Sequence, residues 1–308
     1  FLFILIFLSI FIFFFFHKDE EKKFYGFFWL SKEASILINN WFMMYFLSVV
    51  LIGTVYPIFL DVISSKKISV GPPFYHKLII PFLVPFLLMM AIGPKLKWIK
   101  SQLEDKLYLI SFFIISILLA FLVLKNFSQN ILINTILISS ALYLFFITLR
   151  DFFTKKYKNI SQNVAHFGFS LLILSILFNN LFSSEIITNL KVGETFENSK
   201  TKIVLESVDK KTKQNYNAII ANFTISNSNG EEERLSPELR IYNQPIIATS
   251  EADIKTTLMS DKFIVINLVQ NQDFFNVRYQ VKPFMLWIWI SVVLISFGGI
   301  ISFLQKKS

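Results

Sequence analysis

Apolar residues along the chain fall into long runs that short polar segments separate. A run of about 20 apolar residues is long enough for a helix to cross the hydrocarbon core of a bilayer. We therefore predict an α-helical polytopic membrane protein with about seven transmembrane helices. The stretch WLSKEASILINN (29–40) predicts either an interfacial helix or the lead-in to the second span. The expected spans are residues 1–16, 40–60, 78–96, 107–125, 131–149, 162–182 and 284–303.

Residues 183–283 follow a different pattern, because apolar and polar positions alternate there with a period of two. Such alternation, interrupted by polar turn segments, is typical of strands joined by hairpins. We predict a small antiparallel β domain at 183–283, with the first six helices at 1–182 and a last helix with a basic tail at 284–308. Because a membrane span holds the β domain on each side, we expect the domain to have a docking or gating role over the membrane face. The alternative is that the domain is a passive spacer. The expected strand segments are KIVLESV (202–208), YNAIIANFTIS (216–226), RLSPELRIYN (234–243), FIVINLV (263–269) and FNVRYQV (275–281).

The distribution of Lys and Arg predicts how the chain is oriented in the membrane. Basic residues gather in the linkers at 17–23, 95–106 and 150–158 and at the end, 305–308. When the chain passes back and forth through the seven expected spans, these basic segments all fall on the same side of the membrane. The positive-inside rule assigns that side to the cytoplasm. The β domain is then expected on the outer, periplasmic side.

Composition narrows the class further. The chain is 54% hydrophobic and 17% charged, and its net charge of +9 lies in loops beside the membrane, which gives no support for nucleic-acid binding. The chain has no cysteine, which excludes disulfides, thiolate metal sites and a cysteine nucleophile. The apolar core begins at residue 1 without Met or a basic segment before it, unlike a signal peptide. We expect a truncated product that opens partway through a transmembrane helix.

Four prolines lie in or at the ends of the second and third expected spans, at Pro57, Pro81, Pro85 and Pro94. A proline in a membrane helix frees a backbone carbonyl and marks a kink or a lined cavity. The alternative is that these prolines are simply tolerated, since proline is common in such helices.

The three histidines are the candidate functional residues. His17 follows the first span beside Lys18 and is expected to be a solvated interfacial residue. His76 lies in SVGPPFYHK, an expected outer loop, where it either touches a ligand or is merely polar. His166 lies inside the sixth span, in the motif AHFG, and ionisable residues within spans are costly enough to suggest function.

A neutral imidazole is the usual axial ligand of haem iron. The small residues Ala165 and Gly168 beside His166 let a flat macrocycle or another helix approach closely. The residues alone leave two interpretations of His166 open, a haem ligand or a hydrogen bond to a neighbouring helix. No P-loop, dinucleotide-binding motif, HExxH motif or usable Ser/His/Asp set occurs in the sequence.

Several stretches, in this order along the chain, resemble the C-terminal half of the CcmF/NrfE family, the membrane component of cytochrome c haem lyases. The glycine-proline loop, the AHxG histidine and the KPFxxWIW segment are specific in combination. The stretches are SKEASILINN (31–40), LIGTVYP (51–57), KISVGPPFYHKLIIPFLVPFLLMMAIGPKLKW (67–98), VAHFGFSLLILSI (164–176), RIYNQP (240–245) and VKPFMLWIW (281–289).

This resemblance implies a membrane subunit that works with a haem-carrying chaperone, apocytochrome c and other cytochrome c maturation subunits. The family joins haem covalently to apocytochrome c and holds a b-type haem between two transmembrane histidines, which quinol is thought to reduce. His166 matches the second of these histidines, so it is the expected axial ligand of a haem b iron. The first lies in the family's N-terminal half, so the chain alone is expected to be inactive. The implied location is the bacterial inner membrane, or the mitochondrial inner membrane.

Other residues have weaker expected roles. Gly71, Pro72, Pro73 and His76 are expected to form a tight turn on the substrate side. Arg240 and Tyr242 are expected to contact a partner protein, since both residue types are common at interfaces. Phe167, Leu171 and Leu172 are expected to supply an apolar shell for the haem. A transporter or scaffold without a catalytic haem, and a quinone-interacting redox subunit, are the alternative functions.

Overall fold

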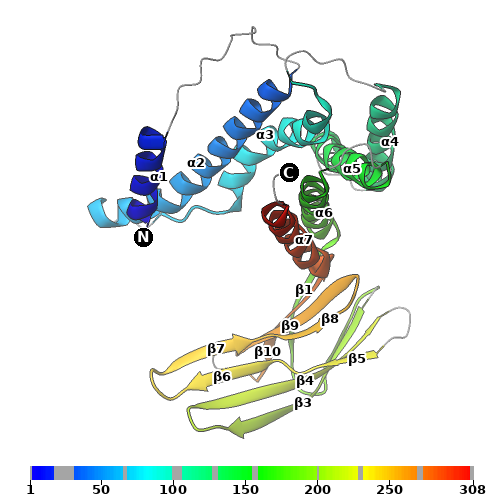
Figure 1. Cartoon of the computed structure of the whole chain (residues 1–308). Helices are drawn as coiled ribbons and strands as arrows, with labels where there is room; N and C mark the ends of the chain where they lie inside the picture. The colour runs from blue at the N-terminus through cyan, green and yellow to red at the C-terminus, as the bar shows by residue number, and fades with distance from the viewer. Residues whose placement is uncertain are drawn as a thin grey trace.

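The computed structural model shows a helical part and a β domain that is inserted between the last two helices (Figure 1). Helices form at all of the expected spans, and six of them are long and apolar enough to cross a membrane. The first helix, α1, has 15 residues and is not among these six. The helices are α1 (Leu2–Phe16), α2 (Lys32–Ser64), α3 (Pro72–Ile92), a short 3-10 helix η1 (Gly93–Lys95), α4 (Lys106–Leu124), α5 (Ile131–Phe153), α6 (Ile160–Phe182) and α7 (Met285–Leu304). The structure describes residues 2–16, 31–64, 68–98, 106–126, 131–154, 159–199, 201–227, 232–268 and 273–305.

Two helices begin earlier than hydropathy predicts. Helix α2 starts at Lys32, so most of the 29–40 stretch is the lead-in to the second span rather than a separate interfacial helix. Ser31 caps this start, since its Oγ accepts a hydrogen bond from the Ala34 N–H at 3.1 Å. Helix α3 starts at Pro72, where the prolines occupy the first helical positions. Proline is favoured there because those N–H groups have no intrahelical partner.

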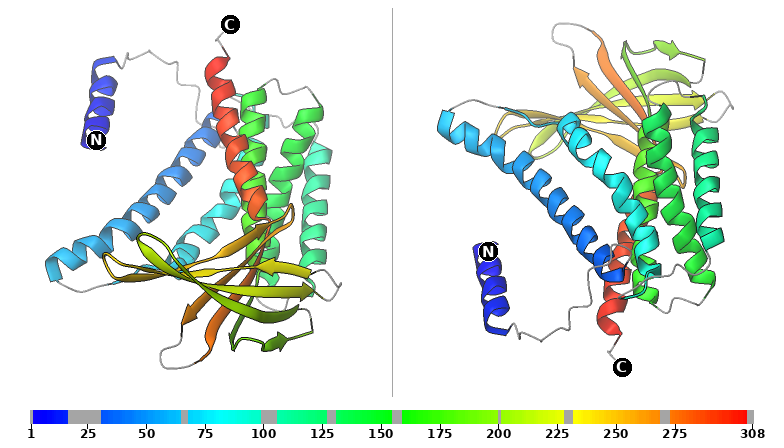
Figure 2. Two further views of the ribbon diagram at one scale, coloured as in Figure 1. Left: turned by 90° about the horizontal axis from the view of Figure 1, so that it is seen from below. Right: turned by 90° about the horizontal axis from the view of Figure 1, so that it is seen from above.

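The helical core lies among α3, α4, α5 and α6. Its buried centre includes Leu87 of α3, Leu144 and Ile147 of α5 and Leu174 of α6. Helix α7 packs along α6, and α2 packs on α3 and leans away from the other helices (Figure 2). Most of α2 therefore presents exposed apolar side chains, as a helix in contact with lipid or another membrane subunit does.

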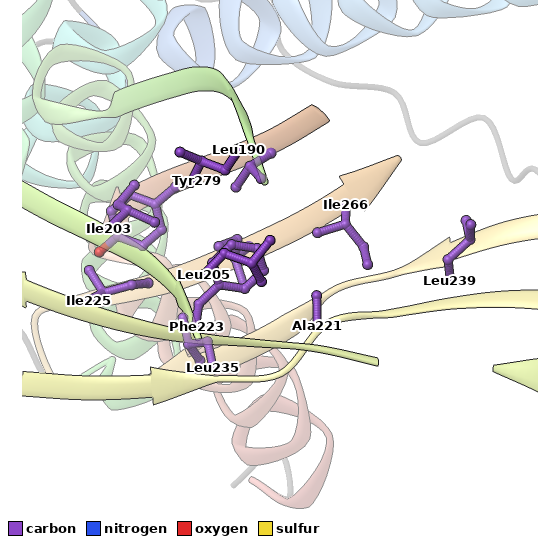
Figure 3. Close-up of a cluster of buried hydrophobic side chains, with 12 residues drawn as sticks. Leu190, Ile203, Leu205, Ala221, Phe223, Ile225, Leu235, Leu239, Ile266 and Tyr279 are labelled. Carbon is purple, nitrogen blue, oxygen red and sulfur yellow. The ribbon is translucent and has the colours of Figure 1, made fainter. Parts of the chain in front are cut away.

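The β domain consists of two antiparallel sheets. One sheet has the order β1-β10-β9-β8, and the other has the order β2-β3-β4-β6-β7 with β5 paired to β4. Their apolar faces enclose a core in which Leu205, Phe223 and Ile266 are fully buried (Figure 3). The strands are β1 (Ser184–Leu190), β2 (Thr195–Glu197), β3 (Thr201–Thr212), β4 (Tyr216–Asn227), β5 (Glu232–Leu235), β6 (Glu238–Tyr242), β7 (Ile247–Glu251), β8 (Asp253–Thr256), β9 (Ser260–Leu268) and β10 (Phe275–Pro283).

All five expected strand segments are strands, with one difference. The segment RLSPELRIYN is not one strand, because it is divided between β5 and β6 at Ser236 and Pro237. Pro237 has no N–H to give to a ladder, which explains the interruption. Strands β1, β2, β7 and β8 are additional to the expected set.

The chain enters and leaves the β domain at adjacent points. Strand β1 follows α6 directly and pairs with β10, which ends at the start of α7, so that Ser184 lies opposite Val281. The Asn179 amide of α6 donates a hydrogen bond to the Pro283 carbonyl at 2.6 Å. Phe284 has a positive φ of 61°, which is uncommon for a residue other than glycine. Its N–H donates to the Met259 carbonyl at 2.8 Å, and its ring lies 5.6 Å from that of Phe178.

The helix ends fall on two sides of the bundle. The end of α2 and the start of α3 lie on the same side as the β domain (Figure 2). The start of α2, η1, the end of α5 and the start of α6 lie at the opposite side. This division agrees with the expected alternation of loops, in which 61–77 and the β domain share one side.

Candidate functional site

His166 lies in the second turn of α6, about 9 Å along the helix axis from its start. It borders a cavity of about 310 Å³ between α2, α3, η1 and α6. The cavity combines apolar side chains with several polar ones, which suits an amphipathic ligand. Its lining residues are Lys32, Ser35, Ile36, Asn39, Met89, Met90, Gly93, Pro94, Asn159, Gln162 and His166.

The backbone carbonyl of Met90 in α3 lies beside the His166 imidazole, as a potential hydrogen-bond acceptor. In an uninterrupted helix, this carbonyl accepts the N–H of the residue four positions later. That residue is Pro94, which has no N–H. The proline therefore leaves the Met90 carbonyl without its usual helical donor, at the place where the His166 ring lies beside it. Among the four span prolines, Pro94 is one that frees a carbonyl beside a lined cavity, as expected from the sequence.

The position of the Met90 carbonyl bears on what the His166 ring can do chemically. When one ring nitrogen donates to a carbonyl, the other keeps a lone pair that is available to a metal. Histidines that bind metals commonly donate their second ring N–H to a carbonyl or carboxylate in this way. Among the described residues, no group of three His, Cys, Asp or Glu is placed to hold a metal ion. His166 can therefore supply one ligand to a metal at this cavity.

The small residues beside His166 pack against α7. A Cβ at Gly168 would lie 3.0 Å from the backbone N of Ile295, and a Cβ at Gly298 would lie 2.8 Å from the Cβ of Ala165. Small residues at these positions allow α6 and α7 to approach closely. Of the two reasons expected for Ala165 and Gly168, the close approach of another helix is the one observed.

Phe167, expected to belong to an apolar shell for the haem, does not line this cavity. The Phe167 ring packs against α5, 5.2 Å from Phe145 and 5.6 Å from Phe152. Neither Phe167 nor Leu171 nor Leu172 is among the described residues that line the cavity. Successive helix residues point about 100° apart, so the neighbour of His166 faces a different helix. The apolar lining comes instead from α2 and α3, through Ile36, Met89 and Met90.

A buried ion pair lies close to the cavity and is absent from the expected set of site residues. Lys95 Nζ of η1 donates to both carboxylate oxygens of Asp151 at the end of α5, at 2.7 and 2.6 Å. The side chains are only 2% and 6% exposed. The pair joins the helix that carries the Met90 carbonyl to α5, so it fixes the wall of the cavity. Sequence reasoning assigned both residues to solvated basic loops.

The structure corrects the expected turn at Gly71, Pro72, Pro73 and His76. Gly71 is extended, with φ −107° and ψ −178°, and it caps α3, while the other three residues lie in the first turns of that helix. His76 is an exposed helical residue on the side of the β domain rather than part of a tight loop. His76 precedes Met90 by 14 residues, about 21 Å along the helix, so it is too far away to share one iron with His166. His17 lies outside the described residues.

Arg240 and Tyr242 lie on the same face of β6 and form a cluster with Tyr216 of β4. The Arg240 guanidinium lies 5.2 Å from the Tyr216 ring centroid, and the Tyr216 and Tyr242 rings are 5.4 Å apart. Arg240 Nε also donates to Glu238 at 2.9 Å. Hydrogen bonds to Glu238 and then Tyr242 raise the pKa of Arg240 above its ordinary value. The two residues lie together in a partly exposed patch, and their expected role as a partner contact stays a prediction.

The fold and the site together define a polytopic membrane protein with a β-sandwich between its last two helices and a histidine beside an intramembrane cavity. Residues 181–283 match a family model described as the CcmF C-terminal beta-sandwich. The β domain thus matches the CcmF C-terminal β-sandwich, and the resemblance to the C-terminal half of the CcmF/NrfE family is confirmed.

Relatives and a solved structure agree with this assignment. The cytochrome c-type biogenesis protein CcmF of Pseudomonas fluorescens is 26% identical over 303 residues, which are 93% of this chain and 46% of that protein. CcmF of Haemophilus influenzae is 27% identical, covering 90% of this chain and 45% of its own length. The structure of a cytochrome c haem lyase CcmF has the same fold, with a TM-score of 0.69 and 20% identity over 91% of this chain and 46% of that chain. The chain therefore spans about half the length of the relatives that it matches.

Proposed function

We propose that the chain is part of a membrane subunit of the cytochrome c haem lyase complex, and that it holds a b-type haem through His166. The observation that carries this proposal is the position of the His166 ring, which borders an amphipathic cavity and lies beside the Met90 carbonyl. That arrangement is the one that metal-binding histidines use. The names of the similar proteins, cytochrome c-type biogenesis protein and haem lyase, supply the reaction.

The residues present fit one half of a site with two histidine ligands. His166 offers a lone pair, and the Met90 carbonyl orients its ring. Ile36 and Met89 exclude water from the apolar part, while Lys32 and Asn39 give polar contacts for the carboxylates of a haem edge. Haem b, when bound, supplies an iron that accepts and passes on one electron. The second ligand would come from the N-terminal half of a CcmF protein.

The partners follow from the same proposal. They are a haem-carrying chaperone, apocytochrome c and other cytochrome c maturation subunits in the membrane, with quinol as the electron donor. The β domain would lie in the periplasm of a bacterium with the helices in its inner membrane, or on the corresponding side of a mitochondrial inner membrane. Arg240, Tyr242 and His76, all on that side, would then face the substrate and partner proteins.

The test is a comparison of optical spectra. The chain is co-expressed with the N-terminal half of a CcmF protein, and reduced-minus-oxidised spectra are recorded in membranes. We expect a b-type signal in the wild type, its loss in His166→Ala, and its persistence in the matched control His76→Ala. Equal amounts of the three proteins in the membrane exclude a folding defect as the cause.

The other outcomes overturn parts of the proposal. A b-type signal that survives in His166→Ala would mean that another residue binds the haem iron. His166 would then have only a role in helix packing. A protein without haem in any of the variants favours a scaffold or transporter.

A further inference from the structure

The turn between β8 and β9, residues 257–260, lies at the end of the β domain that meets the membrane helices. In the sheet β1-β10-β9-β8, Ser260 lies opposite Pro283, two residues before α7 begins. The same end of the sheet holds Ser184, which follows α6 directly. The 257–260 turn is therefore placed beside the points where two membrane-spanning helices leave the bilayer, as the orange strands near α7 in Figure 1 show.

The tip of this turn is apolar and exposed. Leu258 and Met259 are each 59% exposed, although turns exposed to water favour Gly, Asn, Asp, Ser and Pro. The turn is not loose, because the Thr257 N–H donates to the Ser260 carbonyl at 2.9 Å and the Ser260 N–H donates to the Thr257 hydroxyl at 3.1 Å.

The backbone of the turn is also bonded to α7. The Trp287 indole N–H donates to the Leu258 carbonyl at 3.1 Å, and the Phe284 N–H donates to the Met259 carbonyl at 2.8 Å. Polar backbone groups enter a membrane at low cost only when the protein itself supplies their partners. These contacts give partners to the two carbonyls at the tip, so the turn can leave water without losing hydrogen bonds there.

We propose that the 257–260 turn inserts Leu258 and Met259 into the lipid interface on the β-domain side. The occupant of the surface is lipid, because the turn is continuous with the first turn of α7, a helix that spans the membrane. Trp287, which binds the turn, is of the residue type that concentrates at membrane–water interfaces. Side chains that anchor at an interface in this way lie about 5–10 Å into the boundary between headgroups and acyl chains. The turn thereby holds the β domain against the membrane at a third point, besides α6 and α7.

The absence of cysteine from the chain allows a direct test. Leu258→Cys is labelled with an environment-sensitive fluorophore, in the full chain co-expressed with a cysteine-free N-terminal half of a CcmF protein. The complex is reconstituted in phosphatidylcholine vesicles that carry nitroxide lipids, and iodide is added to the water in a parallel sample. We expect quenching by a nitroxide placed near the headgroup, weaker quenching by one near the chain end, and protection from iodide.

The matched control is Leu268→Cys at the other end of the same strand β9. Leu268 is 46% exposed and lies about 26 Å along the strand from Ser260. Its label is expected to be quenched by iodide and not by the nitroxide lipids. The same pattern at position 258 would place the turn in water and overturn the proposal. Protection of position 258 from both quenchers would show that protein covers the turn, which also overturns it. Neither result bears on haem binding by His166.

Discussion

At the scale of single residues, the structure explains why a costly histidine is retained in a membrane helix. His166 lies beside the carbonyl that Pro94 leaves without its helical donor, so two residues that are unfavourable in separate helices can compensate each other. The two interpretations of His166 that the sequence leaves open, a contact with a neighbouring helix and a haem ligand, are therefore compatible. Under the proposed function, a bond to the Met90 carbonyl would orient the ring for the metal.

The Lys95–Asp151 pair gives a prediction about stability. Asp151→Leu leaves the Lys95 ammonium buried without its carboxylate, and we expect the free energy of unfolding to fall by about 3–5 kcal/mol. The double variant Lys95→Met/Asp151→Leu removes both charges and is expected to recover most of this loss. Denaturant unfolding of the purified chain in detergent micelles measures both effects.

The control for this prediction is the exposed pair Lys202–Glu197, with a distance of 3.8 Å and side chains 48% and 67% exposed. Glu197→Leu is expected to change the free energy of unfolding by no more than about 1 kcal/mol. Equal losses for Asp151→Leu and for the double variant would show that the charges themselves do not determine the stability of this region.

Residue patterns could predict His166 but not its contacts. An ionisable residue in an apolar run is visible in the sequence, whereas the Met90 carbonyl lies 76 residues away and comes near it only because α3 and α6 both pack against α5. Lys95 and Asp151 are likewise 56 residues apart, and each is adjacent to a basic loop. Their burial depends on how the ends of α3 and α5 meet, which hydropathy does not encode.

At the scale of elements, the third span shows how prolines shape a membrane helix. Near Pro81, the Tyr45 hydroxyl of α2 donates to the Leu78 carbonyl at 3.0 Å, and at the other end of α3 the His166 ring lies beside the Met90 carbonyl. Side chains from two neighbouring helices thus reach backbone carbonyls of α3. The helix is held between α2 and α6 by polar contacts as well as by apolar packing.

Pro94→Ala tests this arrangement. An alanine at this position restores an N–H that competes for the Met90 carbonyl, so His166 loses its orienting partner. In the complex with the N-terminal half of a CcmF protein, we expect the affinity for haem to fall about 10–100-fold. Haem retention during purification, read from the optical spectrum, measures the effect.

The matched control is Pro57→Ala in α2, because Pro57 does not line the cavity. Its haem content is expected to equal that of the wild type. Unchanged haem binding in Pro94→Ala would show that Pro94 does not determine the orientation of the His166 ring.

Element boundaries show where sequence patterns are informative. Pro72 and Pro73 at the start of α3 are a recognised signal for a first helical turn, and reading them as a loop overlooked it. Strands β3, β4, β9 and β10 have clear alternation and were predictable. Strands β2 and β8 have only three and four residues, too few for alternation to be distinguished from chance.

At the scale of the whole molecule, the two sides of the bundle carry different features. The β domain and the start of α3 lie on one side, while η1, the end of α5 and the start of α6 lie towards the other (Figure 2). His166 is thus closer to the side away from the β domain. An electron donor in the membrane and a protein substrate at the β domain would approach from different directions.

The orientation itself is a prediction. In intact bacterial cells, Val192→Cys in the β domain is expected to react with a membrane-impermeant maleimide, since Val192 is an exposed turn residue. Lys106→Cys at the start of α4 is the matched control and is expected to react only after the inner membrane is permeabilised. The reverse pattern would place the β domain in the cytoplasm and contradict the positive-inside assignment.

The paired junctions between α6 and β1 and between β10 and α7 limit the motion of the β domain. A single linker lets a domain rotate freely about its bonds. Here two linkers run side by side, joined by the Asn179–Pro283 hydrogen bond and the contact between the Phe178 and Phe284 rings. Such a connection suppresses twisting and leaves one main degree of freedom, a bend about the axis through both junctions. Because α6 continues from one junction to His166 without a break, a force that bends the domain is transmitted to the helix that carries the histidine.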